Sequence, residues 1–249
     1  MEKVKLKKDE YQGYKIYFYE DKFDDICKKI LNKEFKELIK LKDTKRNFVS
    51  IIEIDNKKYV YKEPRNEYRI PQRKLMTLFK KGEVLTTLIN VNNLINMGFD
   101  EFIKPLAAVV RRDKRMISFS FLLMEYCKGK EDRNYLEAII EVMKKIHEVG
   151  YYHGDFNPGN FLIENGKVRI LDTQCKKMFL WNYRAHYDMI TMKYDSYDEM
   201  IYPYPKNVFY YLAYFMKKYK RLKFIEKIGA LEKIKRQRLE NISKPLLGE

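Results

Sequence analysis

The sequence predicts an α+β chain of two lobes, a small antiparallel sheet with one helix in residues 1–126 and a mainly helical lobe in residues 127–249. Strand-length segments separated by short polar turns occupy most of the first half, which favours antiparallel pairing. After Asp172 the apolar residues recur mostly at helical spacing. Between the two patterns, Cys127–Lys130 has neither periodicity and is expected to connect the lobes.

Composition limits the class of protein. With 249 residues and 45% hydrophobic content, the chain can bury a sizeable core. Its net charge of +16 favours a negative partner: a nucleotide, a nucleic acid, an anionic membrane or a phosphorylated glycan. A nucleic acid is not expected, because no nucleic-acid-binding motif accompanies the charge. The three separated cysteines predict neither disulfides nor a zinc site. No apolar run approaches the roughly 20 residues that span a bilayer, so a cytoplasmic protein is expected.

The first lobe is expected to begin with a strand and a helix. Tyr14–Tyr19 has strand character, and apolar residues from Phe23 to Ile39 recur at helical spacing. Residues 47–54 and 58–62 then predict a hairpin that turns at Asp55–Lys57 and ends at Lys62.

A long helix is predicted to open at Pro71, with Glu83 the acid in its middle. Two more strands follow, over residues 103–110 and 116–126, separated by a basic turn. Four helices are expected in the second lobe, over residues 135–149, 181–193, 207–219 and 222–239.

A short polar stretch stands out from these elements. Asp155 and Asn160 flank an Asn-Pro-Gly turn, which folds the chain back and can aim both side chains into one space. Residues 161–163 and 168–171 then predict a hairpin whose Asn-Gly turn returns Asp172 to the same place. Carboxylate and amide oxygens suit magnesium and phosphate groups.

These residue types are the ones that metal-assisted phosphoryl transfer needs. Asp155 can orient and deprotonate an attacking hydroxyl, whereas Asn160 and Asp172 offer oxygens to Mg²⁺. Lys62 ends a strand in the other lobe and can hold nucleotide phosphates. Glu83 on a packed helix can fix that lysine through an ion pair.

The order of these residues resembles the protein-kinase fold. Lys62, Glu83, a strand ending Met124-Glu125-Tyr126, the loop His153-Gly154-Asp155 with Asn160, and Asp172 follow one another as the elements of that family do. The resemblance implies ATP as phosphoryl donor, with Asp155 as the catalytic base or hydroxyl-orienting residue. It also implies that Asn160 and Asp172 bind Mg²⁺, that Lys62 and Glu83 clamp the α- and β-phosphates, and that Met124, Glu125 and Tyr126 line the adenine pocket.

Departures from the protein-kinase pattern narrow the class. Gly154 stands where protein kinases have the arginine that reads a phosphorylated activation loop, and Asn157 replaces a substrate-facing lysine. No regulated protein kinase is therefore expected. Because Gly13 is the only glycine before Gly82, the phosphate-covering loop, predicted near Thr44–Asn47, must work without glycines. Lys45 and Arg46 are expected to supply charge there instead.

A His-Gly-Asp loop is typical of kinases that act on small molecules and sugars. Further stretches resemble the lipopolysaccharide core heptose(II) kinase family: Phe79-Lys80-Lys81-Gly82-Glu83, Gly159 to Ile163, Lys167 to Asp172, Lys176-Lys177, and Arg184-Ala185 with Asp188. This resemblance implies ATP-dependent phosphorylation of an inner-core heptose hydroxyl, with a lipid-linked core glycan as the acceptor. It gives Asp188 a structural role, as the residue that holds the catalytic loop.

Two alternatives stay open from the sequence. One is another small-molecule kinase of the same fold, of the aminoglycoside or choline type. The other is a pseudokinase that binds a membrane or protein partner through its basic surface. Basic and apolar residues interleave over 217–238, which is compatible with a solvated helix face or with docking on an anionic membrane. Docking would place the protein at the inner face of the cytoplasmic membrane.

Overall fold

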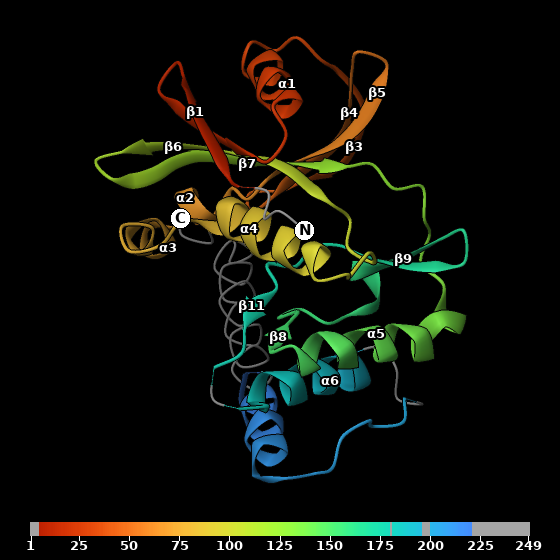
Figure 1. Ribbon diagram of the computed structural model, residues 1–249. Helices are drawn as coiled ribbons and strands as arrows, with labels where there is room; N and C mark the ends of the chain where they lie inside the picture. Colours follow the sequence, from red (N-terminus) through yellow and green to blue (C-terminus); the bar gives the residue numbers. More distant parts are fainter. Residues whose placement is uncertain (1–4, 180, 196–199, 221–249) are drawn as a thin grey trace, which may run out of the picture. The chain divides into compact units, whose positions relative to one another are not determined.

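A seven-stranded sheet dominates the first part of the chain (Figure 1). The structure, a computed structural model, describes residues 5–179, 181–195 and 200–220. The sheet has the order β1-β2-β6-β7-β5-β4-β3, and every neighbouring pair of strands is antiparallel. The strands are β1 (Lys7–Tyr11), β2 (Tyr14–Phe18), β3 (Lys36–Asp43), β4 (Phe48–Ile54), β5 (Lys57–Glu63), β6 (Pro105–Asp113) and β7 (Met116–Glu125).

The predicted hairpins are confirmed at their turns. Asp55 and Asn56, between β4 and β5, have φ of 50° and 59°, the left-handed conformation that a two-residue hairpin turn requires and that Asp and Asn tolerate. Lys114 and Arg115 adopt the same conformation between β6 and β7, with φ of 47° and 68°. The prediction of an antiparallel sheet with a covering helix is therefore confirmed, although β1 and β3 were not predicted.

The helix predicted from Phe23 to Ile39 is wrong in its second half. Helix α1 (Lys22–Leu31) ends where Lys33 takes a φ of 63°, and the chain then enters β3. Ile39 and Leu41 in this edge strand are 54% and 57% exposed, so they contribute little to the core. The spacing of Phe35, Leu38 and Ile39 continues the helical pattern of α1 by coincidence and does not indicate a buried helix face.

The long helix predicted from Pro71 is also wrong. After the short helix α2 (Asn66–Arg69), the segment forms two helices, α3 (Pro71–Met76) and α4 (Glu83–Asn96), instead of one. Gly82 interrupts it with a φ of 98°, and a Cβ at that position would lie 2.5 Å from the Ile117 Cδ1 atom. Glu83 is consequently the first residue of α4 and does not lie in the middle of a helix.

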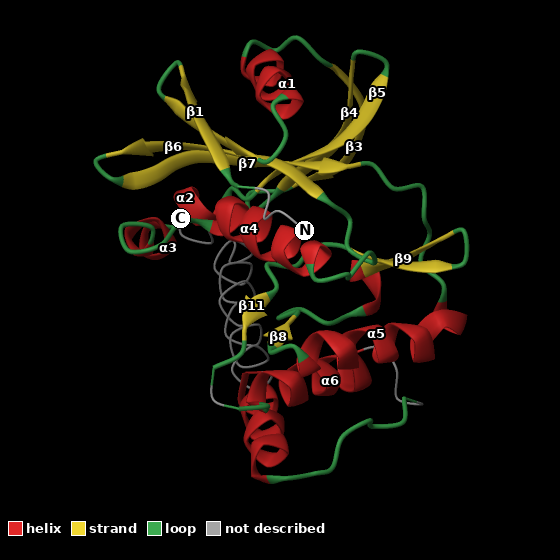
Figure 2. Cartoon of the chain, in the orientation of Figure 1, coloured by secondary structure: helices red, strands yellow, loops and turns green. Residues whose placement is uncertain are grey.

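Helices α1 and α4 cover opposite faces of the sheet (Figure 2). Side chains alternate along β6 and β7, so Ala107 and Leu123 pack with α1 while Ala108 and Leu122 pack with α4. All four are buried. These central strands are apolar on both faces, which fixes their register because a shift by one residue would exchange the two sets.

Shorter elements complete the unit Met1–Lys177. Helix α5 (Leu136–Glu148) follows a single turn, η1 (Arg133–Tyr135), in agreement with the predicted helix over 135–149. The predicted hairpin before Asp172 is confirmed as β9 (Phe161–Glu164) paired with β10 (Lys167–Ile170). The remaining elements are β8 (Tyr151–Tyr152), η2 (Pro158–Asn160) and β11 (Lys176–Lys177), with β8 and β11 paired.

A second compact unit spans Met178–Glu249. Its described part contains α6 (Tyr183–Asp195) and helical residues 208–220, close to the two helices predicted there. Ile190, Tyr210 and Ala213 form its buried cluster. The helix predicted over 222–239 lies outside the described residues. The division into lobes at residues 126 and 127 stays a prediction.

Candidate active site

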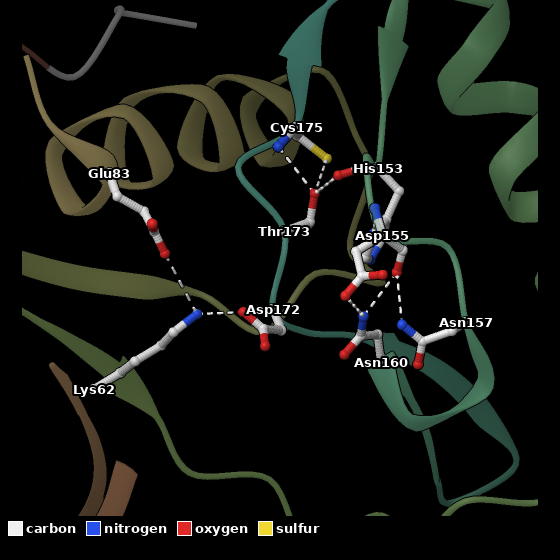
Figure 3. A network of polar contacts seen from close by, with 9 residues as sticks. All are labelled: Lys62, Glu83, His153, Asp155, Asn157, Asn160, Asp172, Thr173 and Cys175. Carbon is white, nitrogen blue, oxygen red and sulfur yellow. Dashed lines mark hydrogen bonds and ion pairs between the residues drawn. The ribbon is translucent and has the colours of Figure 1, made fainter. Parts of the chain in front are cut away.

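Three charged side chains meet where β5, α4 and the end of the β9–β10 hairpin come together (Figure 3). The Lys62 ammonium donates a short hydrogen bond to the Asp172 carboxylate. Its distance to the Glu83 Oε1 atom is 4.0 Å, the outer limit of an ion pair. The Lys62 side chain is only 15% exposed, so its charge is poorly screened by water.

The loop that carries Asp155 is held by side-chain amides. Asn160 donates through Nδ2 to the Asp155 carbonyl at 2.7 Å and approaches the Asp155 Oδ2 atom at 3.5 Å. Asn157 donates to the same carbonyl at 3.1 Å. Gly154 has a φ of 90°, which favours glycine. This bonding leaves the Asp155 carboxylate at the turn, directed toward Asn160 (Figure 3).

Backbone and hydroxyl contacts place Asp172 beside this loop. The hairpin turns at Asn165 and Gly166, both in the left-handed conformation, and Leu171 then donates its N–H to the Asn160 carbonyl at 3.0 Å. One residue beyond Asp172, the Thr173 hydroxyl donates to the His153 carbonyl at 2.9 Å. The structure thus brings Asp155, Asn160 and Asp172 into one neighbourhood.

Charge controls the protonation of Asp172. Burial opposes ionisation of this carboxyl, but the Lys62 ammonium and its hydrogen bond, with smaller effects from His153 and Lys42, hold the pKa of Asp172 below its usual value. The side chain is ionised at neutral pH as a result.

An apolar slot of about 400 Å³ lies next to the Lys62–Asp172 pair. Met124, Glu125 and Tyr126, which the sequence predicted to line an adenine pocket, are among the residues that line the slot. The Glu125 carboxylate itself is engaged by Arg169 and by the Lys104 N–H. The apolar residues that line the slot are Leu41, Val49, Ile51, Val60, Ile103, Met124, Leu162 and Leu171. Its volume and its apolar walls suit a planar heterocycle.

Most of these apolar slot residues were not predicted. Val49 and Ile51 are two apart on β4, and Val60 is two residues from Lys62 on β5, so period-two spacing could have assigned them to one face of the sheet. Leu41 was missed because its strand was not predicted.

Lys45 and Arg46 are not brought to the slot. They lie in the turn between β3 and β4 with exposed side chains, and neither lines the slot. The turn is closed by Thr44, whose hydroxyl oxygen accepts the N–H groups of Arg46 at 3.2 Å and Asn47 at 3.0 Å. A side-chain acceptor therefore closes a turn that contains no glycine.

The donors available to a cation here are hard oxygens. Within residues 5–179, 181–195 and 200–220, no group of three or more His, Cys, Asp or Glu side chains is arranged to hold a metal. The Asp172 carboxylate and the Asn160 Oδ1 atom are the available pair, since Asn160 uses Nδ2 for its bond to the loop. One carboxylate with an amide oxygen suits Mg²⁺ when substrate phosphates complete its coordination.

Comparison with known proteins adds a second line of evidence. The sequence profile of the family described as "Lipopolysaccharide core biosynthesis protein (WaaY)" matches residues 5–230, which is most of the chain. The protein belongs to this family. The resemblance drawn from the sequence motifs is thereby confirmed.

A curated WaaY relative is the lipopolysaccharide core heptose(II) kinase WaaY of Escherichia coli. It is 26% identical over 178 residues, which cover 67% of this chain and 76% of the relative. Across the described residues of this WaaY family member, no helix is long and apolar enough to cross a membrane.

Proposed function

We propose that the protein is an ATP-dependent kinase with a two-lobed, protein-kinase-like fold that phosphorylates a heptose hydroxyl of the lipopolysaccharide core. The observation that carries the proposal is the convergence of Lys62, Glu83 and Asp172 at an apolar slot, with Asp155 and Asn160 on the adjoining loop. Family membership and the name of the Escherichia coli relative support the acceptor.

The slot is the proposed site of the adenine base. Apolar side chains from β4, β5 and β7 would contact its faces, while Met124 to Tyr126 form the edge where the chain leaves the sheet. Lys62 stands where the phosphates would leave the slot. Glu83 would keep the Lys62 ammonium in place when the Asp172 carboxylate binds a metal ion in place of Lys62.

Asp155 is the proposed group that acts on the acceptor. Its carboxylate would accept a hydrogen bond from the heptose hydroxyl, orient the oxygen toward the γ-phosphorus of ATP and take the proton as the new P–O bond forms. The bond to the β-phosphate oxygen breaks and ADP leaves. Asn157 and Asn160 would hold the Asp155 backbone in position through their bonds to its carbonyl.

Magnesium is the proposed metal. Asp172 and Asn160 would hold it, and when bound it would neutralise charge on the phosphate oxygens. The lowered pKa of Asp172 keeps its carboxylate ready as a ligand at neutral pH.

A direct assay tests the proposal. The protein is incubated with Mg-ATP and a dephosphorylated core oligosaccharide, and mass spectrometry should find a gain of one phosphate on the glycan. Choline and an aminoglycoside serve as competing acceptors, since either would be preferred if the protein were another small-molecule kinase. Absence of transfer together with absence of nucleotide binding would favour the pseudokinase alternative and contradict the proposal.

We also propose that the enzyme works at the inner face of the cytoplasmic membrane. Along residues 208–220, Tyr211 and Phe215 are 61% and 63% exposed and stand near the exposed Lys218 and Lys220. Exposed aromatic and basic side chains on one helix suit an anionic membrane surface. The rest of the segment 217–238 lies outside the described residues. Sedimentation with anionic liposomes tests the contact: binding should fall as salt rises, and failure to sediment at low salt would remove it.

A further inference from the structure

A second cavity, here called the polar cavity, is lined in part by Glu83, which does not line the slot. Its volume is about 700 Å³. Glu67 of α2, Arg73 of α3, Lys80 of the following loop, Glu83 of α4, and Gln174 and Lys176 after Asp172 contribute to its lining. Because Glu83 belongs both to this lining and to the Lys62 cluster, the polar cavity adjoins the proposed reaction site.

The two acids of the polar cavity already have partners. Glu83 pairs with Lys62. Glu67 accepts the Glu83 N–H at 2.8 Å through its Oε1 atom, and so satisfies a donor at the first turn of α4 that Gly82 has no side chain to cap. Burial raises the pKa of the Glu67 carboxyl to about 7, despite this hydrogen bond. A substantial share of the Glu67 carboxyl groups is therefore protonated at neutral pH, which reduces the negative charge of the cavity.

Two cations of the polar cavity, Arg73 and Lys80, differ from its acids in this respect. Within the described residues, the side chains of Arg73 and Lys80 make neither an ion pair nor a hydrogen bond, and Lys176 adds a third positive charge. Arg73 and Lys80 thus bring positive charge to the cavity that no hydrogen bond or ion pair among the described residues engages, next to the proposed reaction site.

The loop that presents Lys80 is fixed in place. Arg112 on β6 donates to the carbonyls of Thr77 and Lys80, both at 2.8 Å. The Thr77 hydroxyl in turn accepts the Ile117 N–H of β7 at 2.9 Å. The sheet therefore holds the backbone of this loop before any ligand arrives, which lowers the entropy cost of binding there.

We propose that the polar cavity binds an anionic group, a phosphate or a carboxylate, carried by the acceptor on a sugar other than the one that is phosphorylated. Arg73 and Lys80 are its main ligands. This inference rests on the proposed function, because it assigns the cavity to the acceptor of that reaction. Free phosphate and the phosphates of ATP share the same chemistry, so the test must separate the three sources.

The test compares two acceptors that differ only in charge: one core oligosaccharide that retains its phosphate and carboxylate groups, and one that has been dephosphorylated and carboxyl-reduced. The variant is Arg73→Gln combined with Lys80→Gln. Its matched control is Arg69→Gln combined with Lys57→Gln, which removes the same charge from exposed residues outside the polar cavity. Thermal unfolding of both variants checks that they fold.

The variant should raise the KM for the acidic acceptor about tenfold, as expected for the loss of charge-assisted contacts. The KM for the neutral acceptor and for ATP should stay the same, and the control should behave like the natural protein. Inorganic phosphate should compete with the acidic acceptor in the natural protein and less so in the variant.

Three outcomes would overturn the assignment: equal effects on both acceptors, a raised KM for ATP, or no effect at all. A raised KM for ATP would indicate that the polar cavity binds the phosphates of the nucleotide. If the natural protein transferred phosphate to neither acceptor, the proposed function would fail. Calorimetry of the two oligosaccharides without ATP would then test the anion site independently of phosphate transfer. Equal affinities for the acidic oligosaccharide in the natural protein and the variant would exclude an anion site in the polar cavity.

Discussion

The slot and the polar cavity lie on either side of one ion pair but differ in character. The slot has walls of Val, Ile, Leu and Met, together with the charged residues Lys62, Glu125, Lys128, Lys130 and Asp172. The polar cavity is lined instead by charged, amide and hydroxyl side chains, with Met76 as a large apolar residue among them. Lys62 lines the slot and Glu83 lines the polar cavity, so the proposed site would have one half with apolar walls that suit a flat ligand and another half that offers charge. The difference predicts that changes on the two sides will affect different substrates.

The largest effect should come from the loop beside both regions. Asp155→Asn removes the proposed base but preserves shape, and should lower kcat by about 10²- to 10⁴-fold, the usual contribution of a general base. Nucleotide binding and the melting temperature should hardly change. Asp25→Asn, the same change at an exposed aspartate of α1, serves as the control. If Asp155→Asn failed to fold, the residue would have a structural role instead.

The next effect concerns the ion pair that separates the two regions. Lys62→Met removes the ammonium that bonds to Asp172, and should lower kcat/KM by about a hundredfold, mainly through the KM for ATP. The affinity for the acceptor should remain, because the polar cavity keeps its own cations. Lys57→Met, at the exposed start of the same strand, is the control. An equal loss of acceptor affinity would contradict the separation of the two regions.

The pH dependence of the free energy of unfolding should reveal the buried Glu67 carboxyl of the polar cavity. The Glu67 carboxyl has a pKa of about 7 in the folded protein against 4.5 ordinarily, so the folded state binds its proton more tightly than the unfolded state between those pH values. The free energy of unfolding therefore falls as pH rises from 4.5 to 7. Glu67→Gln cannot titrate and should escape this loss, with a gain on the order of 2 kcal/mol above pH 7.

Urea unfolding of the natural protein and of Glu67→Gln at a series of pH values measures this difference. Glu37→Gln, on the exposed edge strand β3, should show no such pH-dependent gain. A difference that grows as pH falls below 4.5 would have the wrong sign.

The smallest effect should come from the rim of the slot. Leu41→Ala removes one apolar wall residue and should raise the KM for ATP about threefold, since little apolar area is lost. Ile39→Ala is a close control, because Ile39 is similarly exposed on the same strand but does not line the slot. Neither change should alter the KM for the acceptor.

How far the sequence predicted the structure depends on how local each feature is. The hairpins at Asp55–Asn56 and Asn165–Gly166 were predicted because the turn residues themselves determine the backbone conformation. The spacing of Asp155, Asn160 and Asp172 follows from the same kind of local signal, and the structure brings them together.

Features set by tertiary contacts were not predicted. The break between α3 and α4 depends on Gly82 fitting against Ile117 and on Glu67 capping α4 from sixteen positions earlier. The polar cavity combines α3, the loop after it and the segment after Asp172. No periodicity within one segment reports such an arrangement. The strand β3 was missed because its apolar residues continued the spacing of α1.

The turn closed by Thr44 affects the entropy of ligand binding. A loop rich in glycine samples many backbone conformations when free, and gives up that freedom when it orders over a ligand. Here one hydroxyl oxygen accepts two N–H groups, and Arg65 holds the neighbouring Asp43 at 2.8 Å, so the turn is already ordered. The protein thus orders this turn when the chain folds, so a ligand that came to contact the turn would meet a smaller entropic cost.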